Sequence, residues 1–120
     1  MKLQNEMFTI IGGDDDHVKI ELNANHLIYQ AHFPGNPITP GVCIVQIIGE
    51  LLSGRLNRPL ALSKIINLKF NSTISPVADP VVEVNFSTVE ATETECVAKG
   101  TITAGEEIKT KFSLVYIDKV

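Results

Sequence analysis

The sequence predicts an α+β fold in which an antiparallel β-sheet wraps around one central buried α-helix. Most of the chain alternates between apolar and polar residues with period two, which is typical of strands with one buried face. One segment, residues 42–52, breaks this alternation and is apolar on every side, which is typical of a buried helix. Short turn sequences separate the alternating runs, so we expect neighbouring strands to pair antiparallel.

The first two strands are expected before the helix. Residues 7–11 have a strand-like composition, and residues 17–22 alternate apolar and polar side chains. The Gly- and Asp-rich stretch 12–16 suits a tight turn between them. Consecutive aspartates on a turn cannot all face one ion, so no metal site is predicted here.

The predicted helix reads VCIVQIIGELL over residues 42–52. Thr39 is expected to cap its start, and Pro40 suits the first turn, where a missing N–H costs nothing. Ser53 and Gly54 suit its end. Because the helix is apolar all round, only a curved sheet can cover it.

About four long strands are expected after the helix. Alternation is clear in residues 65–70, 82–87 and 108–116. The residues expected to share a buried face are Ile66, Leu68 and Phe70 in the first run, and Ile108, Thr110, Phe112, Leu114 and Tyr116 in the last. A sheet this short exposes its edges, and pairing two copies edge to edge would protect them, so a homodimer is expected.

Composition excludes several classes of protein. The chain has 120 residues and a net charge of −4, so one domain spanning 1–120 is expected, and a general nucleic-acid partner is not. No stretch approaches the roughly 20 apolar residues of a membrane span, and we expect a cytoplasmic protein without a membrane partner. Cys43 and Cys96 are too few for a disulfide framework or a zinc site. Cys43 lies in the first helical turn, where a thiol pKa can fall, but packing is the preferred interpretation.

The segment 31–41, AHFPGNPITPG, carries the chemistry. Its three prolines and two glycines impose an irregular backbone, with His32 near its beginning. The amides of Gly41 and Val42 open the helix, where the first N–H groups lack partners. An imidazole and such a pair of amides suit chemistry next to a carbonyl. A histidine in isolation more often only hydrogen-bonds its loop, and it is the surrounding pattern that favours a catalytic role for His32.

Residues 32–42, HFPGNPITPGV, strongly resemble the active-site motif of 3-hydroxyacyl-[acyl carrier protein] dehydratases. The resemblance implies a hot-dog fold, a dimer with active sites at its interface, and an acyl–pantetheine thioester bound in a tunnel. Acyl carrier protein is the implied partner, in fatty acid or lipid A-type acyl chain synthesis, and no cofactor or metal is expected. Acyl chain length, the pathway and any oligomer larger than a dimer stay open.

The resemblance also assigns roles to individual residues. His32 is expected to act on the α-proton, and the amide of Gly41, with that of Val42, to contact the thioester carbonyl. Phe33 and Pro40 belong to the same motif and are expected to bind substrate.

The helix departs from the family pattern at one pair of positions. The family carries a carboxylate where this chain has Gln46, and commonly a glutamine where this chain has Glu50. Residues four apart share a helix face, so the two groups stay on one stripe in swapped order, about 6 Å apart along the axis. A carboxylic acid can protonate the departing hydroxyl and an amide cannot, and such general acid catalysis is worth roughly 10²–10⁴ in rate.

Three interpretations of this swap remain open. Glu50 supplies the acid; or His32 handles both protons while Gln46 holds the hydroxyl; or the chain has lost catalysis and serves as an acyl-binding partner subunit. An acyl thioesterase is a further alternative, because hot-dog domains also include such enzymes.

A charge asymmetry suggests where a carrier protein docks. No acid lies between residues 51 and 78, whereas Arg55, Arg58, Lys64 and Lys69 do. Arg55 and Arg58 are the candidate docking residues for an acidic carrier, and the alternative is that these cations are only solvated. The family commonly has an N-terminal helical segment before the first long strand, whereas residues 7–11 are expected to form a strand here, which leaves chain-length preference open.

Overall fold

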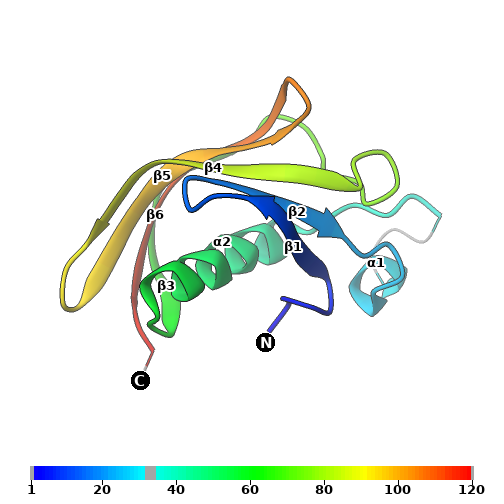
Figure 1. Ribbon diagram of the computed structural model, residues 1–120. Coiled ribbons are helices and arrows are strands. Elements are labelled where there is room, and N and C mark those ends of the chain that lie inside the picture. Colours follow the sequence, from blue (N-terminus) through cyan, green and yellow to red (C-terminus); the bar gives the residue numbers. More distant parts are fainter. Residues whose placement is uncertain (1, 32–34, 120) are drawn as a thin grey trace.

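The computed structural model describes residues 2–31 and 35–119. It contains one six-stranded antiparallel sheet that curves around a central helix (Figure 1). The strand order is β1-β2-β4-β5-β6-β3, which leaves β1 and β3 at the two edges. The elements are β1 (Phe8–Gly13), β2 (His17–Leu22), α1 (Leu27–Ala31), α2 (Gly41–Leu56), β3 (Leu60–Phe70), β4 (Val81–Ala91), β5 (Glu95–Ala104) and β6 (Glu107–Asp118).

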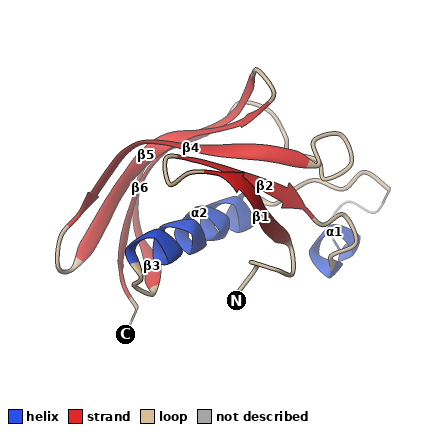
Figure 2. Ribbon diagram, viewed as in Figure 1, coloured by secondary structure: helices blue, strands red, loops and turns tan. Residues whose placement is uncertain are grey.

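The concave side of the sheet faces α2 and forms the core with it (Figure 2). Alternate residues of β2, β4, β5 and β6 are buried there, and Phe86 meets Phe112 edge to face with ring centroids 5.8 Å apart. The alternation predicted for residues 17–22, 82–87 and 108–116 is therefore confirmed, except that Ile108, at the beginning of β6, is exposed.

The start of α2 differs from the prediction in one respect. Thr39 makes no capping hydrogen bond, because its hydroxyl is used elsewhere. Pro40 is the residue that precedes the helix, and its carbonyl accepts hydrogen bonds from the amides of Cys43 and Ile44. The helix therefore begins at Gly41 as expected, but the predicted cap was wrong.

The end of α2 lies beyond the predicted one. The helix continues through Ser53 and Gly54 to Leu56 and stops at Asn57, which has a left-handed φ of 54°. Asparagine adopts this conformation more readily than most residues, so it can close a helix where glycine is absent. The amide of Arg58 then donates to the Ser53 carbonyl at 3.1 Å.

A glycine and a tyrosine set the distance between α2 and the sheet. The Tyr116 hydroxyl donates to the Val45 carbonyl at 2.7 Å, and a Cβ added at Gly49 would lie 2.7 Å from Cε1 of the Tyr116 ring. Burial raises the pKa of the Tyr116 hydroxyl above its usual range. Gly49 is thus required where the ring crosses the helix, despite the cost of glycine in a helix interior.

Strand β3 does not have the buried face predicted for it. Ile66 is 54% exposed and Phe70 48% exposed, while Leu68 is half-buried. The strand lies at a sheet edge, and its register against β6 shifts twice, between Leu62 and Lys64 and again between Ile65 and Asn67. These irregularities break the simple alternation, so the single chain leaves apolar side chains of β3 uncovered.

Within the described residues, no helix is long and apolar enough to span a membrane.

Candidate active site

The motif segment leads from α1 to α2. His32 and Phe33 lie outside the described residues, so their roles stay predictions. The described part resumes at Gly35, whose positive φ of 85° suits glycine, and runs into the first turn of α2 at Gly41.

A hydrogen bond between two buried hydroxyls joins α1 to the later part of the motif segment. Tyr29, on α1, and Thr39, just before α2, are hydrogen bonded to each other at 2.8 Å. The Thr39 amide also donates to the Ile74 carbonyl at 2.8 Å. Burial raises the pKa of Tyr29 to about 12, so this hydroxyl stays protonated at neutral pH. No local motif marks Tyr29, so its role could not be predicted from the sequence, and the prediction that Thr39 caps the helix was wrong.

An apolar pocket of about 320 Å³ lies beside the first turn of α2. Pro40 and Gly41, two of the predicted substrate-binding residues, line it, and so does Phe70. A Cβ at Gly41 would lie 2.9 Å from Cζ of Phe70, so glycine allows the ring to approach the helix start. The side chain of Val42 is 71% exposed and is not part of the lining, which leaves only its backbone amide for the predicted role.

A nearly buried lysine holds the loop that forms one wall of this pocket. Lys109 Nζ lies 2.8 Å from Glu107 Oε1 and 3.3 Å from Asp79 Oδ2. The Lys109 carbonyl accepts hydrogen bonds from the amides of Asn71 and Ser72. The hydrogen bond that Lys109 donates to the Glu107 carboxylate raises the pKa of Lys109. These contacts fix the loop after β3 against β6.

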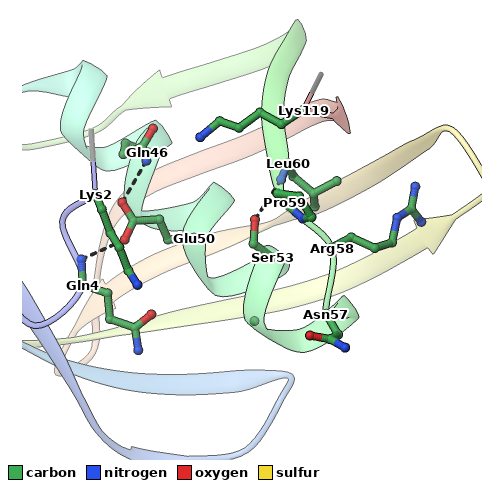
Figure 3. Close-up of a pocket in the computed structure, with 11 residues that line it drawn as sticks. Lys2, Gln4, Gln46, Glu50, Ser53, Asn57, Arg58, Pro59, Leu60 and Lys119 are labelled. Carbon is green, nitrogen blue, oxygen red and sulfur yellow. Dashed lines mark hydrogen bonds between the residues drawn. The ribbon is translucent and has the colours of Figure 1, made fainter.

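The swapped helix pair, Gln46 and Glu50, lies in the second and third turns of α2 and lines a different pocket. Gln46 Nε2 donates to Glu50 Oε2 at 2.8 Å, and both side chains are half-buried (Figure 3). Glu50 also accepts hydrogen bonds from the amides of Leu3 and Gln4, each at 2.7 Å. Gln46 and Glu50 line a pocket of about 390 Å³ near both chain ends (Figure 3).

The two candidate halves of the site are separate within one chain. The helical rise places Gly41 and Glu50 about 14 Å apart along the axis of α2. The pocket at Gly41 and the pocket at Glu50 share no lining residue. The structure therefore brings together Pro40 with Gly41, and Gln46 with Glu50, but not the two pairs with each other.

The candidate docking residues are both engaged within the chain. Arg55 Nη1 lies 3.0 Å from Asp16 Oδ1 and donates to the Asp15 carbonyl. Arg58 pairs with Asp118 at 2.8 Å and donates to carbonyls of the β4–β5 turn. Each guanidinium is thus offset by an acidic neighbour, and the acid-free stretch of sequence is not an unpaired basic surface at these two positions.

The cysteines are buried thiols in the structure. Cys43 and Cys96 are both free, and burial raises the pKa of each. Cys43 is 2% exposed, which confirms that this thiol packs in the core. In the described ranges 2–31 and 35–119, no cluster of three metal-ligating side chains occurs.

Solved structures share this architecture. The dehydratase heterocomplex ApeI:P from Xenorhabdus doucetiae superposes with a TM-score of 0.59 at 14% identity, covering 91% of this chain and 94% of that one. A hypothetical thioesterase with coenzyme A from Streptococcus pneumoniae TIGR4 gives 0.60 at 14% identity, covering 93% and 85%. Identities this low show the fold alone, and that fold is the hot dog.

Sequence comparison defines the family. Residues 12–106 match the model of the ApeI-like family, described as ApeI dehydratase. The 3-hydroxyacyl-[acyl-carrier-protein] dehydratase FabZ of Caldanaerobacter subterraneus subsp. tengcongensis is 26% identical over 80% of this chain and 72% of its own length. FabZ of Thermoanaerobacter sp. strain X514 is 27% identical over 80% and 71%. The chain belongs to the ApeI-like dehydratase family.

Proposed function

We propose that this protein removes water from a 3-hydroxyacyl thioester carried on acyl carrier protein, giving the trans-2-enoyl thioester in fatty acid or lipid A-type acyl chain synthesis. The observation that carries the proposal is the family match over residues 12–106, which includes the whole motif segment. The described geometry is compatible with it, because the motif ends at the first turn of α2 beside an apolar pocket.

The proposed reaction uses both ends of the motif. The imidazole of His32 takes the α-proton, and the electron pair of that C–H bond forms the new double bond as the β-hydroxyl leaves. The amides of Gly41 and Val42, at the positive end of α2, stabilise negative charge on the thioester carbonyl oxygen. The imidazolium of His32 then gives this proton to the departing hydroxyl, which leaves as water, and Gln46 orients that hydroxyl.

Product analysis tests the proposed function. The purified protein is incubated with a 3-hydroxyacyl chain on acyl carrier protein and with the same chain on pantetheine. A dehydratase forms the conjugated enoyl thioester and releases no thiol. Release of free thiol without an enoyl product would identify a thioesterase, and neither product would identify a non-catalytic acyl-binding subunit.

We further propose that the protein forms a homodimer through β3. This edge strand exposes four large apolar side chains, Leu62, Ile65, Ile66 and Phe70. An unpaired apolar edge is a ready template for a second strand, so covering it with another copy removes both the apolar surface and the open edge. In a dimer, the pocket at Gly41 of one protomer and the pocket at Glu50 of its partner would lie on the two sides of one shared site.

Placing a lysine on this edge is expected to break the dimer. Ile66→Lys should shift the protein from dimer to monomer in sedimentation experiments, because a charge would be buried without a partner. Ile11→Lys is the matched control, since Ile11 is 47% exposed on the opposite edge strand β1 and Ile66 is 54% exposed. Equal effects of the two variants, or a wild-type monomer, would contradict the proposed interface.

Docking of the carrier protein at Arg55 and Arg58 remains part of the proposal. An acidic carrier would have to replace Asp16 and Asp118 as the partners of these guanidinium groups. Both ion pairs are partly solvent-exposed and therefore weak enough to exchange.

A further inference from the structure

The first residues of the chain form a compact turn that packs beside α2. We call residues 3–8 the N-terminal turn. Leu3, Met7 and Phe8 are almost completely buried. The amide of Met7 donates to the Leu3 carbonyl at 2.7 Å, and the amide of Asn5 donates to the Phe8 carbonyl at 2.7 Å. The turn is therefore a closed and packed unit, joined directly to edge strand β1.

The carboxylate of Glu50 binds this turn to α2. Its Oε2 accepts the Leu3 amide and its Oε1 accepts the Gln4 amide, both at 2.7 Å. These bonds link residues that are 47 and 46 positions apart in the chain. Hydrogen bonds from amides to a charged acceptor are stronger than those between neutral groups. Glu50 therefore anchors the N-terminal turn to α2.

The same carboxylate sets which way the Gln46 amide faces. Gln46 Nε2 donates to Glu50 Oε2 at 2.8 Å, so the NH₂ group lies toward Glu50 and the carbonyl oxygen away from it (Figure 3). A flipped amide would place its oxygen against a carboxylate that already accepts two backbone amides, and two acceptors cannot share a hydrogen bond.

We propose that Glu50 is a positioning residue, which together with the N-terminal turn holds Gln46 in the orientation that binds the substrate hydroxyl. This inference rests on the proposed dehydratase function. The Glu50 carboxylate accepts hydrogen bonds from the Leu3 amide, the Gln4 amide and Gln46 Nε2. A carboxylate with three donors around it suits an anchor better than a proton donor. It also accounts for the swapped order, since a glutamate at position 46 would face Glu50 one turn away and repel it.

A double-mutant cycle on turnover separates positioning from direct acid catalysis. We expect Glu50→Ala to lower kcat by about 10- to 100-fold, because misplacing a reacting group by about 1 Å can cost 10²-fold. In the Gln46→Ala background the same substitution should lower kcat by less than about threefold, since the group it positions is gone. Equal fold-losses in both backgrounds would show that Glu50 acts by itself and would overturn the inference.

Amide hydrogen exchange supplies a readout that does not depend on turnover. Glu50→Ala should speed exchange at the Leu3 and Gln4 amides and shift the side-chain NH₂ signals of Gln46. Glu6→Ala is the matched control, because it removes a carboxylate from the same turn without touching Glu50 and should change neither. Unchanged exchange and Gln46 signals in Glu50→Ala would refute the anchor, whereas a wild-type protein without turnover would refute the proposed function instead.

Discussion

Replacing His32 with alanine is expected to lower the turnover of a 3-hydroxyacyl thioester by about 10²–10⁴-fold, the usual contribution of a positioned acid–base group. The proposed mechanism has no other base at the α-carbon, and in the described helix pair Gln46 is an amide and Glu50 is bound by two backbone amides. The loss should appear in kcat, measured from the rate of enoyl thioester formation under saturating substrate.

His26→Ala is the matched control for this substitution. His26 lies just before α1, and its ring Nδ1 accepts a hydrogen bond from the Ile28 amide at 3.1 Å. Its removal should weaken the start of a short helix without reaching the reacting atoms. An unchanged rate in His32→Ala would end the assignment of His32 as the base, and equal losses in the two variants would point to general disruption of the loop.

Replacing Gly49 with alanine is expected to destabilise the fold, because overpacking a core usually costs about 1–3 kcal/mol. The added Cβ would lie 2.7 Å from Cε1 of Tyr116, and that ring is held by its hydroxyl, which donates to the Val45 carbonyl. The gain in helix propensity, up to about 1 kcal/mol, offsets only part of this cost.

Gly54→Ala provides the comparison within the same helix. A Cβ at Gly54 would meet nothing within 4 Å, so the alanine should stabilise the protein by about 0.5–1 kcal/mol. Urea unfolding of both variants measures the two changes in free energy. Shifts of the same sign would show that Tyr116 does not constrain α2.

Much of the fold is predictable because its strands obey a short-range rule. Alternation in residues 17–22, 82–87 and 108–116 correctly marks faces that pack on α2, with the exception of the exposed Ile108. Strand β3 does not follow this rule, because its burial depends on strands that are far from it in the sequence. Its place at the edge depends on the order of all six strands, and its two register shifts depend on β6, so local periodicity could not reveal its exposed face.

The candidate site likewise has features that follow from adjacent residues and features that depend on contacts between residues far apart in the chain. The start of α2 at Gly41 follows from adjacent prolines and glycines. The partners of Glu50 do not, because Leu3 and Gln4 lie 47 and 46 residues away and contribute backbone amides that carry no sequence signal. Thr39 was assigned to the helix because capping is local, whereas its actual partner is the Tyr29 hydroxyl.

The most direct test of the central claim is the mass of the acyl chain on acyl carrier protein after incubation with the wild-type protein. The proposed function predicts that a 3-hydroxyacyl chain loses the mass of one water while its thioester bond stays intact, and that His32→Ala suppresses this loss. An unchanged chain, or a carrier protein released with its free thiol, would contradict it.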